Sequence, residues 1–565
     1  MNLFKLFLFI LSLNLIFEPL LHAEEAPVNI SSAQAEQTFK DIGSKISITP
    51  INRLPLHQNG RIKPLDTLSR ESLLFISGSY KRFGLNPVQT YLALSAVQVS
   101  PFVEILQVRD VELRTKLGFL KSKRLFSLSE IESSPLSQLA EPLFNKQQEN
   151  SRLLTEHEKN ILEVYHQMSA LRDIISGQTI TMAADYSFLE NNHESNSHGS
   201  DGSNSPNPEM QQAMTNYFQS LNQTAETQAE AANKLLLKSN EQKAPELFQH
   251  YLEKLDIEIF YNQLKPFFWA ALLALFLGVS FFSPLFKNKV SKKWTQILYS
   301  LPMIFIILGL GLRVYITQFA PITNMYGTMI WVAFGISFFG FILFSLYKNY
   351  SVPGITLIAT GLMLLLTEQI PLILSPDLDP IVAVLRSNFW LSTHVTTITI
   401  SYAALTIAMV LGNIALIRLW IYKDNTAFFK EYSHYAYRMI QLGCFLLSVG
   451  IILGGIWADY SWGRFWGWDP KETWALIADL GFLAILHGRF VGWITPFTLL
   501  AWSPLAYLLV IMAWYGVNFI LAAGLHSYGF SSGGATLVAI FVTVQITLLI
   551  AGLIKYRTLK PQPHE

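Results

Sequence analysis

The chain has 565 residues, of which 51% are hydrophobic and 14% are charged, with a mean hydropathy of +0.32. This apolar content is higher than a soluble protein of this size would expose to water, so part of the chain is expected to lie in a membrane. The net charge of +1 argues against nucleic acid as a partner. One cysteine, Cys444, forms no intramolecular disulfide and makes thiol redox chemistry by the chain itself unexpected.

The first residues predict a secretory leader. A short apolar run, Leu6 to Phe17, follows Lys5, and Ala23 stands at a typical cleavage position. The run is shorter than the ~20 residues that a spanning helix needs. Residues 1–23 are therefore interpreted as a signal peptide, with a retained anchor as the alternative.

A polar region, residues 24–265, predicts a soluble and mainly helical domain, with helical periodicity around 161–175. Within it, residues 191–210 are rich in Ser, Asn, Gly and Asp. Such a segment buries too little apolar area to offset the entropy of ordering, so it predicts a disordered loop.

Nine apolar runs of membrane-spanning length follow. They lie at approximately 267–285, 296–316, 325–346, 354–372, 391–421, 438–457, 470–487, 498–521 and 535–554, with the first transmembrane helix placed within 266–290. The predicted fold is an α-helical polytopic membrane protein with about nine transmembrane helices and an N-terminal, mainly helical extracytoplasmic domain. Lys and Arg concentrate in the connectors after the odd-numbered runs, which the positive-inside rule assigns to the cytoplasm. The N-terminal domain and the connector before Trp474 then lie outside a cytoplasmic membrane.

That connector is dense in tryptophan. Residues Trp462 to Trp474 contain four Trp together with Arg464 and Lys471, which supply flat surface and cationic groups. One interpretation is a platform for a planar ligand with carboxylates. The other is an aromatic belt at the membrane surface, with Asp469, Pro470 and Glu472 capping the next helix. Residue chemistry alone leaves both open.

Three histidines lie at the ends of predicted spans. His394 and His526 fall at the outer ends of the fifth and eighth runs, on the same face as the tryptophan-rich connector. Two imidazoles beside an aromatic surface are what a metal macrocycle requires for axial ligation. His487 falls at the inner end of the seventh run, where an ionisable residue is a candidate functional residue. For each histidine, a side chain hydrogen-bonded to backbone is the structural alternative.

Several motifs together resemble a known family. They are Ala320 to Tyr326, Asn388 to Val395, Gly454 to Ala458, Trp462 to Trp474, Leu486-His487 and Gly524 to Gly529. Over residues 296–554 the sequence resembles the CcsA/ResC branch of the heme-handling proteins, in System II cytochrome c biogenesis. The resemblance implies a CcsA-like membrane domain at 291–557 with a tryptophan-rich (WWD) loop at 457–474. The segment His57 to Leu68 resembles the end of the CcsB/ResB part.

The resemblance implies heme b as substrate and ligand, and a role as a component of a cytochrome c synthase that forms thioether bonds. It implies iron ligation by His394, His526 and His487, and no catalytic residue is assigned. The implied heme-contacting residues are Trp457, Trp462, Arg464, Trp466, Trp468, Asp469, Lys471 and Trp474.

The implied partners are an apocytochrome c with a Cys-x-x-Cys-His motif, thiol-reducing proteins and a separate CcsB/ResB-like membrane protein. The last is expected because the first four predicted spans contain no histidine to complete the site at His487. Two alternatives remain: a heme-handling protein of the System I type, or a transporter of another planar substrate.

Overall fold

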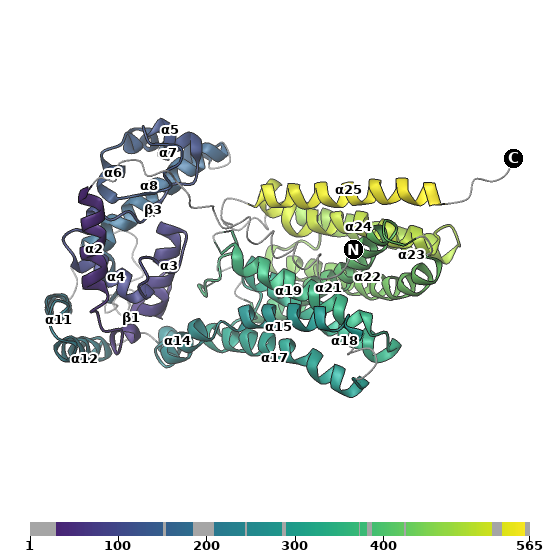
Figure 1. Ribbon diagram of the computed structural model, residues 1–565, viewed down its shortest axis with the longest axis horizontal. Coiled ribbons are helices and arrows are strands. Elements are labelled where there is room, and N and C mark those ends of the chain that lie inside the picture. The colour runs from purple at the N-terminus through teal and green to yellow at the C-terminus, as the bar shows by residue number, and fades with distance from the viewer. Residues whose placement is uncertain are drawn as a thin grey trace.

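A computed structural model describes residues 30–150, 154–184, 208–242, 246–284, 290–371, 373–380, 387–422, 425–521 and 534–559. The predicted leader lies outside these residues. A compact N-terminal domain stands at one end of a bundle of long helices that run side by side (Figure 1). The ends of the long helices that face this domain are called the domain ends below, and the opposite ends the far ends.

The N-terminal domain is mainly helical, with two short antiparallel two-stranded sheets: the β1–β2 hairpin and the β3–β4 pair, whose strands are separated by α5. Its elements are α2 (Ile30–Gly43), η1 (Ile51–Arg53), β1 (Pro55–Gln58), β2 (Arg61–Pro64), α3 (Leu65–Ser77), α4 (Pro87–Ala96), η2 (Ser100–Phe102), β3 (Leu106–Gln107), α5 (Val111–Lys116), β4 (Leu125–Phe126), α6 (Leu128–Glu132), α7 (Leu136–Asn150), α8 (Glu156–Ile175), α9 (Gln178–Ala184), α11 (Pro208–Ser220), α12 (Ala225–Glu241), α13 (Glu246–Leu252) and α14 (Leu255–Leu264).

Helix α8 contains the periodic segment that the sequence predicts. It starts with a capping box between Thr155 and Glu158 and buries one apolar face against α3 and α4. The predicted disordered loop ends earlier than expected, because α11 begins at Pro208 and residues 208–210 are helical. Residues 191–207 lie outside the described residues.

The membrane region consists of α15 (Pro266–Ser280), α17 (Lys292–Thr317), α18 (Met325–Tyr347), α19 (Ser351–Gln369), α20 (Asn388–Trp390), the π-helix η5 (Leu391–Val395), α21 (Thr396–Arg418), α22 (Thr426–Trp462), α23 (Pro470–Phe490), α24 (Pro496–Ile511), the π-helix η6 (Met512–Leu521) and α25 (Ala535–Leu559). Within the described residues, nine helical stretches are long and apolar enough to span a bilayer. The predicted fold class and the nine predicted spans are confirmed.

Two predicted boundaries differ from the structure. The first membrane helix lies within the predicted range 266–290, but its apolar run, expected at 267–285, ends earlier, at Ser280 of α15; residues 285–289 lie outside the described residues. Helix α22 has 37 residues and extends past the membrane-spanning length to Trp462. The tryptophan-rich loop expected at 457–474 is therefore only the short connector from Gly463 to Asp469, flanked by helices.

Helix α21 occupies the centre of the bundle, where it packs against α18, α22 and α24. In its most apolar window 72% of the residues are buried, against 11% for the peripheral α25. Small residues permit this packing: a Cβ added at Gly412 would lie 2.2 Å from the carbonyl oxygen of Leu500 on α24. The central helix therefore provides a rigid support for η5, which precedes it directly.

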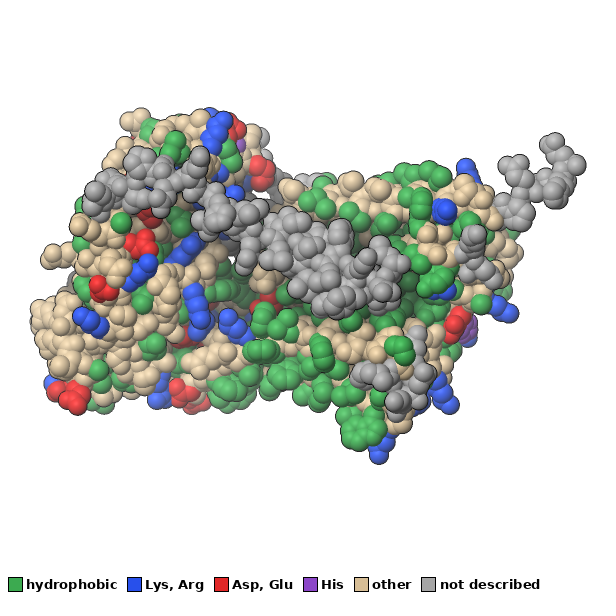
Figure 2. Space-filling model, viewed as in Figure 1, with side chains coloured by type: hydrophobic (Ala, Val, Ile, Leu, Met, Phe, Trp, Pro, Cys, Tyr) green, Lys and Arg blue, Asp and Glu red, His purple; other side chains and the backbone are tan. Residues whose placement is uncertain are grey.

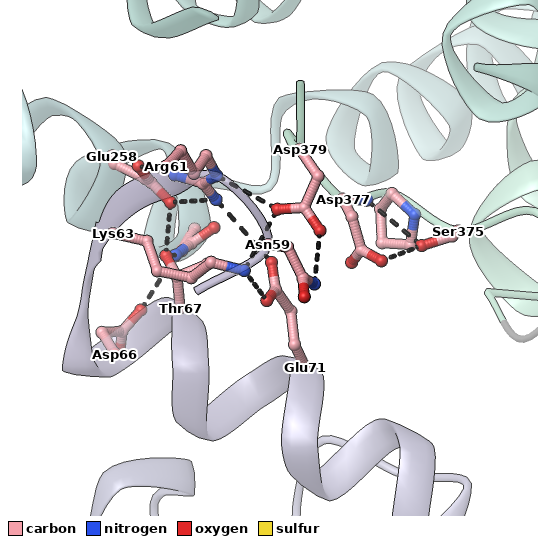
Figure 3. A network of polar contacts seen from close by, with 12 residues as sticks. Asn59, Arg61, Lys63, Asp66, Thr67, Glu71, Glu258, Ser375, Asp377 and Asp379 are labelled. Atoms are coloured by element: carbon pink, nitrogen blue, oxygen red, sulfur yellow. Dashed lines mark hydrogen bonds and ion pairs between the residues drawn. The ribbon is translucent and has the colours of Figure 1, made fainter. Parts of the chain in front are cut away.

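A buried ion network joins the N-terminal domain to the membrane region (Figure 3). The fully buried Arg61 on β2 donates two hydrogen bonds to Glu258, at 2.8 and 3.0 Å, and one to Asp379 at 3.2 Å. Lys63 contacts Glu71 at 2.5 Å and Asp379 at 3.1 Å. Since Asp379 follows the fourth span, the hairpin and the membrane region are fixed together.

This network makes folding stability sensitive to pH through Glu71. Burial raises the pKa of the Glu71 carboxyl from 4.5 to about 7, against the opposing effect of Lys63. The folded state then holds a proton that the unfolded chain releases, so this contribution is complete below about pH 4.5 and lost as pH rises through about 7. The free energy of unfolding of the wild-type chain should fall by roughly 2–3 kcal/mol across that window through Glu71, and Glu71→Gln should abolish this fall. Thermal unfolding of the detergent-solubilised chain between these pH values tests this, and an unchanged pH slope in the variant would contradict it.

Candidate functional site

A pocket of about 1160 Å³, including its open mouth, lies among the domain ends of the central helices. Segments that are far apart in sequence form its wall: the start of α18, η5 with α21, α22, the tryptophan-rich connector, the start of α23, and η6. The wall is mainly apolar, with a few polar side chains, and its size reaches the upper end of the range for ligand sites, ~300–1,000 Å³. Two of its walls are π-helices, a conformation that occurs frequently at functional sites.

His394 belongs to the π-helix η5 and lines this pocket. Its Nδ1 lies 2.8 Å from the carbonyl oxygen of Gly450 on α22. A carbonyl only accepts, so Nδ1 carries a proton, and the tautomer with this proton has its lone pair on Nε2. A backbone carbonyl that fixes the tautomer in this way is typical of a metal-ligating histidine.

One glycine of α22, Gly454, makes room for this ring, and a second, Gly450, lets α21 approach α22. A Cβ added at Gly454 would lie 2.6 Å from Cε1 of His394, and one added at Gly450 would lie 3.0 Å from Ile398 of α21. Trp457, one turn further along α22, is buried with its ring centroid 5.7 Å from that of His394. The small residues thus let the imidazole lie against α22 beside an indole.

The connector between α22 and α23 contributes Trp466 to the pocket wall. Glu472 holds the connector in place: its carboxylate accepts hydrogen bonds from the backbone N–H groups of Gly467, at 2.9 Å, and Asp469, at 3.2 Å, and from Arg464 at 3.2 Å. Asp469 caps α23 in a capping box with Glu472, as the sequence predicts. The capping of α23 and the presence of a tryptophan in the pocket wall are therefore compatible.

Polar groups from α23 and η6 also line the pocket. The Lys471 ammonium donates to Asn518 Oδ1 at 2.9 Å, and Asn518 in turn donates to the carbonyl of Trp514 at 3.0 Å. The buried Trp514 Nε1–H, which also belongs to a pocket-lining residue, meets no acceptor among the described residues. A buried donor without an acceptor is costly unless a ligand or a water supplies one.

The structure brings only some of the predicted heme-contacting residues into this wall. Trp457, Trp466 and Lys471 line the pocket, whereas the other five do not: Trp462, Arg464, Trp468, Asp469 and Trp474. Arg464 lies over the Trp462 ring, 5.7 Å from its centroid. Trp468 is 71% exposed and has a positive φ of 56°, with its ring edge-to-face with Trp466 at 5.8 Å.

The other two predicted iron ligands are not placed in the pocket. His487 is exposed at the far end of α23, where Nδ1 donates to the carbonyl of Leu483 at 2.8 Å. It lies sixteen residues beyond Lys471, roughly 24 Å along the helix. His526 lies outside the described residues.

Asn324, Tyr402, Trp514 and Asn518 also line the pocket, although the sequence did not single them out. Asn324 begins α18 as its N-cap and donates to the carbonyls of Ser375 and Asp377. A polar residue within an apolar run, such as Asn518, is the signal that could have revealed part of this set.

Comparison with known proteins places this region in context. The family model described as "Cytochrome C assembly protein" matches residues 322–526. Protein NrfI of Wolinella succinogenes is 36% identical over 300 residues, which cover 49% of this chain and 31% of NrfI, so the chain spans about a third of that relative. Cytochrome c biogenesis protein CcsA of Prochlorococcus marinus subsp. pastoris is 36% identical over 279 residues, covering 44% of this chain and 86% of that protein. The protein of the same name from Chlamydomonas reinhardtii is 41% identical over 160 residues, covering 27% and 44%.

Proposed function

Because this chain belongs to the CcsA family of cytochrome c biogenesis proteins, we propose that its tryptophan-lined pocket binds heme and presents it for attachment to apocytochrome c. The observation that carries the proposal is the His394 imidazole, held by the Gly450 carbonyl in the tautomer that offers Nε2 to a metal. Heme b is the substrate in this scheme, and His394 supplies one axial ligand to its iron.

The remaining wall suits the other parts of heme. Trp457 and Trp466 offer apolar π-faces to the macrocycle, and the Lys471 ammonium with the Trp514 N–H offers hydrogen bonds to the propionate groups. Arg464 is directed to Glu472 instead, so it positions the connector rather than binding a propionate. Trp462, Trp468, Asp469 and Trp474 act in the same scheme by shaping and anchoring the connector.

The attachment reaction needs heme held still while two thiols reach its vinyl groups. Each addition forms one C–S bond and moves the thiol hydrogen onto the vinyl group, so no net oxidation occurs. The chain's contribution is to orient the macrocycle, exclude water with its indoles and hold the iron until the histidine of the Cys-x-x-Cys-His motif replaces an enzyme ligand. In this role the chain is a component of a cytochrome c synthase.

His526 and His487 complete the proposal. His526 follows η6, which also contributes residues to the pocket wall, and is proposed as the second axial ligand. His487, at the far end of α23, is proposed to receive heme first. A CcsB/ResB-like chain would supply its second ligand, since no histidine occurs in the first four spans. Residues 24–290 are proposed as the end of a CcsB-like part, and residues 291–557 as the CcsA-like domain.

The chain is a multi-pass membrane protein. We propose the bacterial cytoplasmic membrane, with the N-terminal domain and the pocket on the periplasmic side, because Lys and Arg concentrate in the far-end connectors. This orientation gives the pocket access to apocytochrome c and to the thiol-reducing proteins that keep its cysteines reduced.

A pair of tryptophan substitutions tests the proposal. Trp466→Leu keeps an apolar side chain in the pocket but removes the π-face, so we expect heme content to fall about fivefold. Trp493→Leu changes a tryptophan that is 84% exposed in the connector between α23 and α24 and does not line the pocket, so it serves as the matched control. The heme absorption spectrum of the purified chain, normalised to protein, measures both. Equal heme content in wild type and the Trp466 variant would favour a membrane-surface belt and count against the pocket.

A further inference from the structure

A second cavity, the junction cavity, lies where the N-terminal domain meets the membrane region. It measures about 730 Å³ including its open mouth, and it is walled by α3 and Tyr80 and by the domain ends of α15, α18 and α19. Because these helices begin or end here, the cavity lies at the depth of lipid headgroups. It shares no lining residue with the tryptophan-lined pocket.

Two carboxyl groups of this wall have no ion-pair partner. Glu368, in the last turn of α19, accepts a hydrogen bond from the Tyr326 hydroxyl at 2.5 Å, and Asp377 accepts one from Ser375. Among the described residues, no cationic nitrogen lies within 4.0 Å of either carboxylate. Burial, and then the charges of Glu368 and Asp377, raise the pKa of the Tyr80 hydroxyl beside them, so it stays protonated.

Apart from Lys265, the other charged groups of the wall are already paired. Arg70 donates two hydrogen bonds to Asp66, at 2.7 and 3.1 Å, and Glu71 is paired with Lys63. Among the residues that the structure describes, Glu368 and Asp377 are therefore buried carboxyl groups of the cavity wall without a salt-bridge partner, and a cationic ligand would supply one.

The rim of the cavity has the opposite charge and leads to lipid. Lys265 is exposed, immediately precedes the apolar helix α15, and has no carboxylate within 4.0 Å among the described residues. Trp269, Leu272 and Phe276 follow it at helical spacing on one exposed face of α15. Figure 2 shows hydrophobic side chains gathered over this part of the membrane region, with Lys and Arg side chains at its boundary with the N-terminal domain.

We propose that the junction cavity binds the head group of an aminophospholipid. Asp377 and Glu368 receive the primary ammonium, Lys265 contacts the phosphate, and an acyl chain follows the Trp269 face of α15. From the cavity toward the bilayer, the protein presents carboxyl groups, then a lysine, then an apolar face. Phosphatidylethanolamine presents the complementary groups in the same order: an ammonium, a phosphate and acyl chains. A primary ammonium donates three hydrogen bonds, whereas the choline group of phosphatidylcholine donates none.

The first test uses the unmodified full chain. Native mass spectrometry of the chain exchanged into mixed micelles with equal phosphatidylethanolamine, phosphatidylcholine and phosphatidylglycerol should show about tenfold preferential retention of the first. Free phosphoethanolamine added in excess distinguishes head-group recognition, in which it competes, from recognition that also needs the acyl chains, in which it does not. Equal retention of the three lipids would overturn the proposal without any variant being required.

The second test locates the site. Glu368→Gln with Asp377→Asn should reduce the retention of phosphatidylethanolamine about tenfold, and Lys265→Gln should reduce retention of the ethanolamine and glycerol lipids alike. Lys293→Gln, at the far end of α17, is the control and should change neither. His394→Ala should also leave lipid retention unchanged, which separates this proposal from heme binding. Unchanged lipid selectivity in the double variant, or binding of a lysine-rich peptide in place of lipid, would refute it.

Discussion

The substitution His394→Ala is expected to stop cytochrome c maturation and to reduce the heme content of the purified chain more than about tenfold. The reason is geometric. Among the described residues, His394 is the histidine that lines the tryptophan-lined pocket. The Gly450 carbonyl fixes its tautomer. Removing the imidazole leaves a space that free imidazole can enter, so millimolar imidazole should partly restore the heme spectrum.

The matched control for this substitution is His434→Ala. His434 lies at the far end of the bundle, on α22, where Nε2 is 3.2 Å from the Tyr347 hydroxyl. We expect its variant to bind heme and mature cytochrome c like wild type. If both variants lost heme equally, general damage to the bundle would explain the result, and if neither did, His394 would not be an iron ligand.

The substitution Arg61→Met should destabilise the folded chain by about 3–5 kcal/mol. Arg61 is fully buried, and its removal leaves Glu258 and Asp379 without the guanidinium that compensates them. For a domain of this size the thermal midpoint should fall by roughly 10 °C. Thermal unfolding of the full chain in detergent, followed by circular dichroism, measures the change.

Arg53→Met is the control for this effect, because Arg53 pairs with Asp256 at the same junction but on the surface. An exposed pair contributes less than ~1 kcal/mol, so the thermal midpoint should barely move. Arg61→Lys keeps the charge but loses the two-pronged contact with Glu258, and an intermediate loss is expected. Equal effects of Arg61→Met and Arg53→Met would show that the buried network contributes little.

The membrane spans were predictable because hydropathy and length are local properties of the sequence. The helix start at Asp469, Pro470 and Glu472 was predictable for the same reason, since a capping box involves neighbours in the chain. The continuation of α22 to Trp462 was not, because aromatic and polar residues at a membrane surface suit both a loop and a helix.

The walls of the pocket depend on contacts between distant segments, which one sequence does not encode in a readable pattern. The sequence pointed to His394 and to the tryptophans, but not to the Gly450 carbonyl that fixes the imidazole. The buried network was likewise invisible, because Arg61 and Asp379 are 318 residues apart and each resembles an ordinary surface charge. Only the fold shows that both are enclosed.

That separation also imposes an order on biosynthesis. When the ribosome has released the N-terminal domain, Arg61 and Lys63 have been made, but Asp379 emerges only after four spans have been synthesised. Until then the hairpin lacks part of the negative charge that makes its burial favourable, so the domain cannot reach its final packing. Completion of the domain therefore waits for membrane insertion of the first four helices, and a ribosome-bound chain ending before residue 379 should remain sensitive to protease at the β1–β2 hairpin.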